Sequence, residues 1–477
     1  MKPVPVLIAL LVAAFAPGRA GAEQQTVSRD FLCYNHVVFH TPDWEDRRYA
    51  SAVRALGAGR LRIPGGTLAD FWDWGPGGIV GEDRWPSGVR PPYSYEARSL
   101  KGMTLPAIAP FFAATGSKPM FGLNVFSVDL ASELQALKEA AVAGLVVDRI
   151  QIGNEPYFAE PYMTERFPQP EDFAAFAVEA AADVRSAFPE AQIAVPGVVM
   201  TRDREAKPRL AGWNEALIAA GVFDVADAVF IHPYIGSNLR AIDADPGALT
   251  PAHAAQVARW GLQPDNFFLG QDWLARLPAA TRIWITEYNY FEPAGGERVS
   301  GTWLQGLVNA ARVLRWMDDP RIEHACLHQL IGHHAWQALA SAKGGALTYR
   351  DGRPEHADDA EPFALAASGV ALARLGKVVG EGEARLAASS LDAPGAPVVA
   401  RVFRHRDGAE TAILINLSDS PVDASALLPN AATAEIVSGE PWSAVYDPAH
   451  TTVSQQTVFG RALAAPPFSI VTATTRP

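Results

Sequence analysis

Cysteine and positive charge are both scarce in this sequence. Only Cys33 and Cys326 occur among its 477 residues, which excludes a disulfide-rich scaffold and a zinc site built from cysteines. Lys and Arg number 40 against 52 Asp and Glu, giving a formal net charge of -12, whereas a nucleic-acid surface needs clustered basic residues. We therefore expect no nucleic-acid partner, and the charge suits a neutral or mixed substrate in a polar cleft.

Long apolar runs are also missing after the N-terminus, where no stretch reaches the roughly 20 apolar residues that cross a bilayer. The chain starts with a basic residue, continues with a mostly apolar run over Val4–Phe15, and has small residues at Ala20 and Ala22. This pattern is typical of a signal peptide, and a proline and an arginine interrupt the run too early for a membrane anchor. We expect residues 1–22 to be removed, leaving a secreted or periplasmic chain without membrane contact.

Eight short runs rich in Val, Ile and Phe recur between residue 31 and about residue 332, with helical patterns between them. Pro170 and Glu171 open one helix, because proline suits the first turn and an acid suits the positive end of the helix dipole. Apolar residues spaced by three and four from Leu130 and from Trp303 indicate two more helices. Eight strands alternating with helices predict an α/β fold, a closed (β/α)8 TIM barrel over residues 23–376. The expected strands are Phe31–Phe39, Arg60–Pro64, Pro119–Val125, Arg149–Ile152, Gln192–Pro196, Ala228–Ile231, Arg282–Thr286 and Ala325–Leu330.

The pattern changes after a helix expected over Phe363–Leu375. The later strands alternate or are rich in β-branched residues, and turn signals rather than helices separate them. We expect residues 377–477 to form a C-terminal antiparallel β-sandwich, to which Thr26–Arg29 adds an edge strand. The expected strands are Val398–Phe403, Thr411–Leu417, Thr433–Val437, Thr452–Val458 and Phe468–Ala473.

The two cysteines fall in the first and the eighth expected strand, which are neighbours when a barrel closes. Each lies near the start of its strand, so we expect Cys33 and Cys326 to be close together. Export permits a disulfide, yet paired strands rarely offer suitable geometry and buried free cysteine is common. Both states stay open at this point.

Two glutamates follow strands that face each other across the mouth of such a barrel. Glu155 stands in Gly-Asn-Glu-Pro after the fourth strand, and Glu287 stands in Glu-Tyr-Asn after the seventh. Barrel enzymes carry their catalytic groups at these strand ends, and retaining glycosidases need two carboxyl groups about 5 to 5.5 Å apart. Either glutamate alone is explained as well by a solvated loop, but both at the right strand ends are much harder to obtain by chance.

The two motifs resemble those of the clan A glycoside hydrolases, which place the acid/base after an Asn at the end of strand four and the nucleophile at the end of strand seven. The resemblance extends over about residues 24–477, with its specific motifs all in the barrel. It implies that Asn154 holds the 2-hydroxyl of the substrate, that Glu155 is the acid/base, and that Glu287 is the nucleophile.

The end of the second strand, residues 62–67, reads Arg-Ile-Pro-Gly-Gly-Thr. It resembles Arg-aromatic-Pro-Gly-Gly-Asn of α-L-arabinofuranosidases and Arg-Phe-Gly-Gly-Thr of heparanase-like β-glucuronidases, and it matches neither fully. Gly65 and Gly66 let the backbone approach a ligand closely, and Thr67 belongs to the same candidate site. Arg62 would orient the nucleophile and keep it ionised, since a nearby cation lowers a carboxyl pKa. An ordinary glycine turn beside a surface arginine is the alternative.

Further candidates for substrate contact lie at other strand ends and in the rim loops. His232 and Tyr234 follow strand six, where clan members often place a His or Tyr beside the nucleophile; a histidine packed before a turn is the alternative. Asp70 and Trp72 would offer an acid and a flat ring to a sugar, unless their loop is simply tucked onto the rim. The last candidates are Tyr288 in the pocket wall and Trp336 in the loop after strand eight.

Four histidines around strand eight raise the alternative of a metal site. Their segment has the pattern of a strand and a loop, and neither a cysteine nor a paired carboxylate nearby completes a ligand set. We therefore expect no metal and no cofactor. These residues are His324, His328, His333 and His334.

The residues together predict a retaining glycoside hydrolase that cleaves a poly- or oligosaccharide by double displacement, with a carbohydrate as its partner. Uronic acid and arabinofuranose are the two sugars that the strand-two motif suggests. A catalytically silent carbohydrate-binding protein on the same barrel is the alternative, and a metal-dependent hydrolase would need a ligand cluster that the sequence does not supply. The sequence indicates no particular oligomeric state.

Overall fold

The computed structural model describes residues 25–37, 43–85, 103–236, 239, 249–263, 271–292, 298–331, 336–340, 347–350, 353–356, 361–380, 383–388, 391, 397–443, 451–457 and 463–475. The expected signal peptide of residues 1–22 lies outside them. Within the described part of the chain, no helix is long and apolar enough to cross a membrane.

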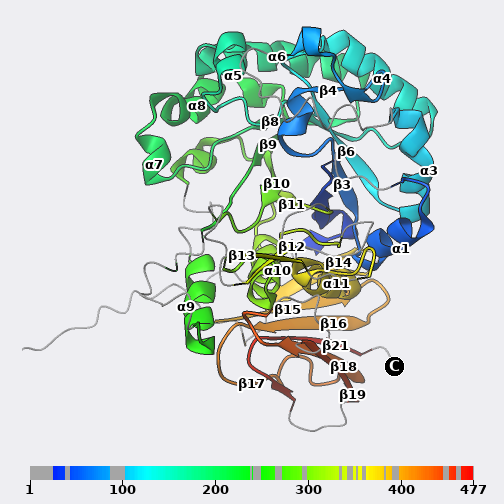
Figure 1. The fold of residues 1–477 in the computed structure, drawn as a ribbon, viewed down its shortest axis with the longest axis vertical. Coiled ribbons are helices and arrows are strands. Elements are labelled where there is room, and N and C mark those ends of the chain that lie inside the picture. Colours follow the sequence, from blue (N-terminus) through cyan, green and yellow to red (C-terminus); the bar gives the residue numbers. More distant parts are fainter. Residues whose placement is uncertain are drawn as a thin grey trace, which may run out of the picture.

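Eight parallel strands close into a barrel, which confirms the predicted fold (Figure 1). Each strand of the first seven pairs with the next along the chain, and the eighth pairs with the first to close the barrel. Because all eight run in parallel, their C-terminal ends meet at one mouth. The strands are β2 (Leu32–Asn35), β3 (Arg60–Ile63), β6 (Lys118–Leu123), β7 (Arg149–Ile152), β8 (Gln192–Pro196), β9 (Ala228–Ile231), β10 (Arg282–Tyr288) and β11 (Ile322–His328).

A helix follows every barrel strand and packs its apolar face on the barrel. The predicted helix at Pro170 begins there, behind a capping box in which Gln169 and Asp172 each accept the other's backbone N–H. The helices expected from Leu130 and from Trp303 also begin at those residues. In chain order the covering helices are α1 (Arg47–Ala55), α3 (Leu105–Thr115), α4 (Leu130–Val142), α6 (Pro170–Ala187), α8 (Pro208–Ala219), α9 (Pro251–Gly261), α10 (Trp303–Trp316) and α11 (Ala367–Val379).

The C-terminal part forms the predicted antiparallel sheet domain, built on a sheet of seven strands. The expected N-terminal edge strand is present, because Thr26 and Val27 pair with Arg385 and Ala384. A two-stranded ladder, β17 (Val422–Asp423) with β20 (Ala464–Ala465), makes a second small sheet. The large sheet runs in the order β1 (Thr26–Val27), β14 (Ala384–Ala388), β15 (Val398–His405), β16 (Glu410–Asn416), β21 (Ser469–Thr474), β18 (Thr433–Gly439) and β19 (Thr451–Thr457).

Strand alternation gives the large sheet two buried faces. Val399, Ile413 and Ile415 join the main core, where α10 and α11 lie between this sheet and the barrel (Figure 1). Val398 and Leu414 point the other way into a separate apolar cluster shared with β17 and β20. The expected domain boundary at residues 376–377 falls inside α11, which contacts both α10 and β16.

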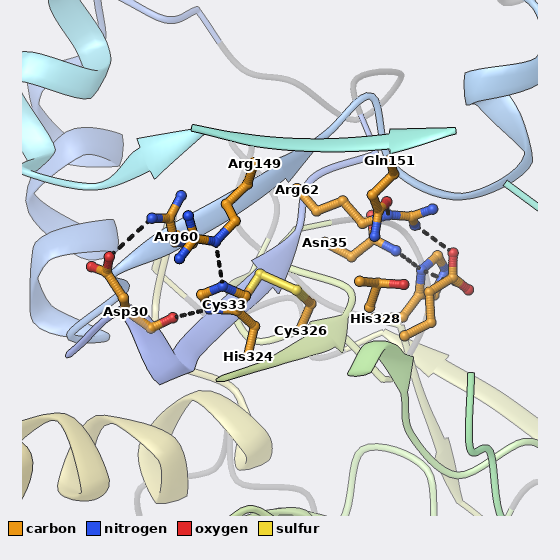
Figure 2. The surroundings of a disulfide bond; sticks show 12 residues. Asp30, Cys33, Asn35, Arg60, Arg62, Arg149, Gln151, His324, Cys326 and His328 are labelled. Atoms are coloured by element: carbon orange, nitrogen blue, oxygen red, sulfur yellow. Dashed lines mark hydrogen bonds and ion pairs between the residues drawn. A yellow bond between two sulfur atoms is a disulfide. The ribbon is translucent and has the colours of Figure 1, made fainter. Parts of the chain in front are cut away.

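The barrel interior holds three layers of side chains (Figure 2). A charged layer at the N-terminal ends of the strands includes Arg60 and His324, and a polar layer at the mouth includes Arg62 and His328. Between them Cys33 and Cys326, which face each other in the pairing of β2 with β11, form a disulfide. The expected closeness of the cysteines is confirmed, and of the two states left open the bonded one is present. Around it lie Met120, Ala194, Ala228, Phe230 and Trp284.

Candidate active site

The expected catalytic residues converge at the mouth of the barrel. Glu155 lies three residues after the end of β7, and Glu287 lies within β10, which continues to Tyr288 instead of ending at Thr286. Glu287 is buried, with 4% of its surface exposed, whereas the side chain of Glu155 is 17% exposed. The fold thus brings two carboxyl groups, 132 positions apart in the sequence, into one site.

Arg62 is the centre of the polar layer at the mouth. Its guanidinium donates through Nη1 to Glu287 Oε1 at 2.7 Å, through Nη2 to Asn154 Oδ1 at 2.7 Å, and through Nε to Gln151 Oε1 at 2.6 Å. The side chain is fully buried, so this network is rigid and holds the carboxylate in one orientation. The amide Nδ2 of Asn154 is buried and has no hydrogen-bond partner among the described residues.

The second oxygen of Glu287 faces three further groups. Tyr234 donates its hydroxyl to Oε2 at 2.7 Å, and the Nδ1 atoms of His328 and His232 lie 3.6 and 3.8 Å from it. Burial alone would raise the pKa of Glu287, but His232, His328 and Arg62 and the Tyr234 hydrogen bond outweigh burial and hold the pKa well below its usual range. Glu287 is therefore ionised at neutral pH.

His232 connects the two glutamates. Its Nδ1 lies 2.7 Å from Glu155 Oε1, and its Nε2 lies 2.9 Å from the hydroxyl of Thr286. Tyr157 donates its hydroxyl to the same Glu155 oxygen at 2.8 Å. Because Nδ1 is also 3.8 Å from Glu287 Oε2, the two carboxylate oxygens are no further apart than the sum of 2.7 and 3.8 Å.

The glycine turn after β3 passes over the nucleophile candidate. Gly66 has φ +66, and a Cβ there would lie 3.4 Å from His328 Cε1 and 4.0 Å from Glu287 Oε1. A Cβ on Gly65 would overlap the side chain of Asn35 at 2.1 Å, so Gly65 accepts no larger residue without movement, whereas at Gly66 the positive φ disfavours a side chain and the space does not. Thr67, half-buried, is the second residue of a 3-10 helix over Gly66–Asp70.

Two of the expected sugar contacts are core residues in the structure. Trp72 is 1% exposed and packs edge-on against Trp74, so its ring offers no open face to a sugar. Tyr288 is equally buried and packs against Trp316, because it follows the inward-pointing Glu287 and faces the helices instead. For Trp72 the structure supports the alternative of a loop tucked onto the rim, and the buried ring of Tyr288 forms no open wall for a sugar.

Asp70 is also fully buried. Tyr162 donates its hydroxyl to Asp70 Oδ2 at 2.9 Å, and burial raises the pKa of Asp70 to about 8. Its carboxyl is therefore neutral at pH 7 and adds no third negative charge beside Glu155 and Glu287. The hydrogen bond from Tyr162 and the burial therefore place Asp70 within the protein interior.

Two aromatic side chains, Phe291 and Trp336, pack against Tyr234 and His328, which face Glu287 Oε2. Trp336 stacks on Phe291 with ring centroids 6.3 Å apart, and Phe291 also packs edge-on against Tyr234. Phe291 is 59% exposed, which is unusual for so large an apolar side chain, and the sequence analysis missed it. Its position four residues after Glu287, in the loop that leaves β10, was the available signal.

Other residues missed from the sequence belong to the polar layer. Gln151 and Asn35 point inward from β7 and β2, and His328 points inward from the end of β11. Counting every second residue back from the strand ends would have found them, because alternate residues of a barrel strand face the interior.

The histidines near strand eight do not form a metal site in the described part of the chain. His324 lies at the opposite end of the barrel from His328, where it bonds Arg149 and the backbone of Asp30. No group of three or more potential ligands is present among the described residues. His333 and His334 lie outside the described residues.

Comparisons with known proteins agree with this architecture. No protein-family model and no curated protein sequence matches the chain. A family 51 α-L-arabinofuranosidase from Bifidobacterium longum superimposes with a TM-score of 0.66 at 13% identity, covering 95% of this chain and 97% of that one. The family 51 α-L-arabinofuranosidase of Thermotoga petrophila gives 0.64 at 15% identity, covering 94% and 97%.

A third solved structure has a different activity. The 4-O-α-L-rhamnosyl-β-D-glucuronidase from Fusarium oxysporum superimposes with a TM-score of 0.62 at 15% identity, covering 94% of this chain and 97% of that one. At such identities the likeness extends to the fold. The chain therefore has the barrel-and-sheet fold of these glycosidases, as its motifs' resemblance to clan A glycoside hydrolases implied.

Proposed function

We propose that this chain is a retaining glycoside hydrolase with Glu287 as nucleophile and Glu155 as acid/base. The observation that carries the proposal is the shared contact with His232, because the nearest oxygens of the two carboxyl groups are no further apart than the sum of 2.7 and 3.8 Å. This upper bound allows the roughly 5 to 5.5 Å of a retaining pair and lies at the lower end of the inverting range. An inverting pair needs about 6.5 to 9.5 Å between its carboxyl groups, so that a water molecule fits between carboxylate and sugar.

The two glutamates differ in the way that double displacement requires. Glu287 is held ionised and oriented by Arg62 and Tyr234, as suits attack on the anomeric carbon. The more exposed Glu155 would protonate the leaving oxygen and would then take a proton from the water that releases the sugar. Asn154 supports this assignment, since its buried, unpartnered amide N–H groups can donate to the hydroxyl next to the anomeric carbon.

The substrate we propose is a poly- or oligosaccharide containing arabinofuranose or uronic acid. The structural neighbours with those activities and the sequence of the strand-two turn both support these two sugars. Phe291 and Trp336 add an apolar surface at the edge of the site, on which a sugar ring can stack. We further propose that the enzyme acts outside the cytoplasm, after removal of residues 1–22.

Substitution of the two glutamates tests the assignment. Glu287→Gly should abolish the first chemical step on aryl α-L-arabinofuranosides and aryl β-glucuronides alike. Glu155→Ala should keep turnover of substrates with activated aryl leaving groups, and added azide should accelerate it and yield a glycosyl azide of retained configuration. Glu215→Gln, at an exposed glutamate of α8 that pairs with Arg276, is the matched control and should behave as wild type.

Three outcomes would contradict the proposal. Near-normal polysaccharide activity in either variant would remove the assigned roles. A first-formed sugar of inverted configuration, followed by NMR, would replace the retaining mechanism by an inverting one. Binding of a saccharide without any turnover by the wild type, over the whole panel of aryl glycosides and polysaccharides, would favour the silent carbohydrate-binding protein.

A further inference from the structure

The first and the last barrel strand, β2 and β11, pair with each other where the barrel closes, and this contact is called the seam below. It carries a disulfide next to a pair of polar residues. In the pairing of β11 with β2, Cys326 faces Cys33 and His328 faces Asn35. Since alternate residues of a strand point to the same side, the disulfide and the Asn35–His328 pair form successive layers of the barrel interior (Figure 2). The disulfide is buried, and it covalently joins the first barrel strand to the last.

The pair above the disulfide stands next to the proposed nucleophile. Asn35 is fully buried, and its Nδ2 lies 2.8 Å from His328 Nδ1. An amide nitrogen can only donate, so Nδ1 of the neutral His328 ring accepts this hydrogen bond. The same Nδ1 lies 3.6 Å from Glu287 Oε2, so His328 connects the strand pair β2–β11 to the carboxylate of the proposed nucleophile.

We propose that the Cys33–Cys326 disulfide is a positioning element of the active site. It holds β2 and β11 in register so that the Asn35 amide donates a hydrogen bond to His328 Nδ1 beside Glu287. The inference rests on the proposed function for its meaning in catalysis, but the geometry of the seam stands without it. A hydrogen bond of 2.8 Å tolerates a slip of only a few tenths of an ångström before it weakens. The disulfide limits such slip more strongly than backbone hydrogen bonds alone.

Loss of this hold would change the charge next to the nucleophile. With Asn35 displaced, Nδ1 is free to take up a proton and to form an ion pair with Glu287, which would occupy the attacking oxygen. Burial lowers the pKa of His328 in the intact site, and the competing charges around the ring do not reverse that direction. The charged or titratable groups that face His328 are Glu287 from β10, Arg62 from β3, His232 and Tyr234 after β9, and Glu155 after β7.

The test is the double variant Cys33→Ala/Cys326→Ala in the full chain. If the disulfide positions the pair, the pKa of His328, followed by NMR titration of the ring and assigned with His328→Gln, should rise toward the ordinary value of about 6.5. The pH profile of kcat should then gain an acid limb in that range, with about a tenfold loss at pH 5.5 relative to wild type. KM should change little. An unchanged His328 titration together with a wild-type profile would overturn the proposal.

Two further variants separate positioning from stability. Asn35→Ala keeps the disulfide but removes the amide, so it should reproduce the new acid limb, and combining it with the cysteine double variant should add little more. Ile413→Ala, in the buried core of β16, lowers stability far from the seam and should leave both the profile and the His328 titration unchanged. Fully additive effects of Asn35→Ala and the cysteine variant would contradict the proposal.

One of the two measurements does not depend on the enzymatic assignment. The His328 titration does not require turnover, so it reports on the seam even if the Glu287 variants fail to support a glycosidase. A raised pKa of His328 with unchanged catalysis would refute the role in positioning, while leaving the proposed function in place. A raised pKa of His328 in the cysteine variant, together with Glu287 variants that fail to support a glycosidase, would refute the proposed function and still show that the disulfide holds the Asn35–His328 pair.

Discussion

At the scale of single residues, the charge on Glu287 depends on one hydroxyl that can be removed cleanly. Tyr234 donates to Glu287 Oε2, and this bond lowers the pKa of the carboxyl together with the surrounding cations. Tyr234→Phe should therefore raise the pKa of Glu287 and move the acid limb of kcat/KM to higher pH, with about tenfold less activity on the acid side. The measurement is a pH profile on an activated aryl glycoside.

The control for this change is another buried tyrosine hydroxyl. Tyr49 is fully buried, and its hydroxyl has no hydrogen-bond partner among the described residues. Tyr49→Phe should leave the pH profile where it is. If Tyr234→Phe behaved in the same way, the hydroxyl would have no part in holding Glu287 ionised.

Some site residues can be recognised from a short sequence motif, and others only from the packing of segments that are distant in the sequence. Arg62, Asn154, Glu155 and Glu287 stand in short motifs at strand ends, so a single sequence reveals them, and the structure gathers all four. For Trp72 the sequence left a sugar contact and a packed loop both open, because an aromatic residue beside glycines has the same local pattern in a core as on a rim. Only the packing of distant segments decides between the two.

At the scale of elements, one buried acid of α4 contacts the loops that follow β4 (Trp72–Asp73) and β6. Glu133 accepts the backbone N–H of Asn124 at 3.1 Å, and burial raises its pKa to about 8. The folded-state pKa lies above the value near 4.5 of the free side chain, so ionising Glu133 opposes folding. The stability of the protein should thus fall as the pH rises from about 4.5 through about 8.

Glu133→Gln tests this directly, because glutamine keeps the acceptor oxygen without the charge. The variant should be more stable than wild type at pH 9, on the order of 2 kcal/mol, and the difference should shrink toward pH 5. Chemical denaturation at both pH values provides the measurement. Glu139→Gln, an exposed position on the same helix, should show no such dependence; a pH-independent difference for Glu133→Gln would disprove the explanation.

Element boundaries were predicted well where polarity changes and poorly where polar groups are buried. β11 begins at Ile322 instead of Ala325, because Glu323 and His324 are polar yet satisfied at the barrel base by Trp284 and Asp30. The helix expected from Phe363 begins only at Ala367, since Phe363 has φ 63 and cannot continue a right-handed helix. β14 was missed, as its small residues carry little hydrophobic signal.

At the scale of the whole molecule, the C-terminal sheet covers a face of the barrel that is apolar. Trp303 opens α10 with its backbone N–H on Ser443 O and its ring N–H on Phe468 O at 2.7 Å, so the sheet also completes this helix end. All of α10 except Arg315 is buried, which requires apolar neighbours on every side. The barrel and the sheet therefore form one continuous core.

A chain ending near residue 377 should consequently be insoluble, because truncation exposes the face of α10 and α11 that the sheet covers. Expression followed by size-exclusion chromatography measures the outcome, with the full chain prepared in parallel. A soluble truncated chain that keeps its activity would show that the barrel folds alone.

The pairing of β1 with β14 has a consequence for the order in which the molecule can assemble. Thr26 and Val27 are made before any barrel strand, yet their partners Arg385 and Ala384 are made after all of them. The outer edge of the sheet thus closes a loop that contains the entire barrel, and closing so long a loop costs entropy before any contact repays it. Such non-local contacts slow folding, so this edge should be among the last parts to form. During synthesis, the first segment must wait for the final fifth of the chain.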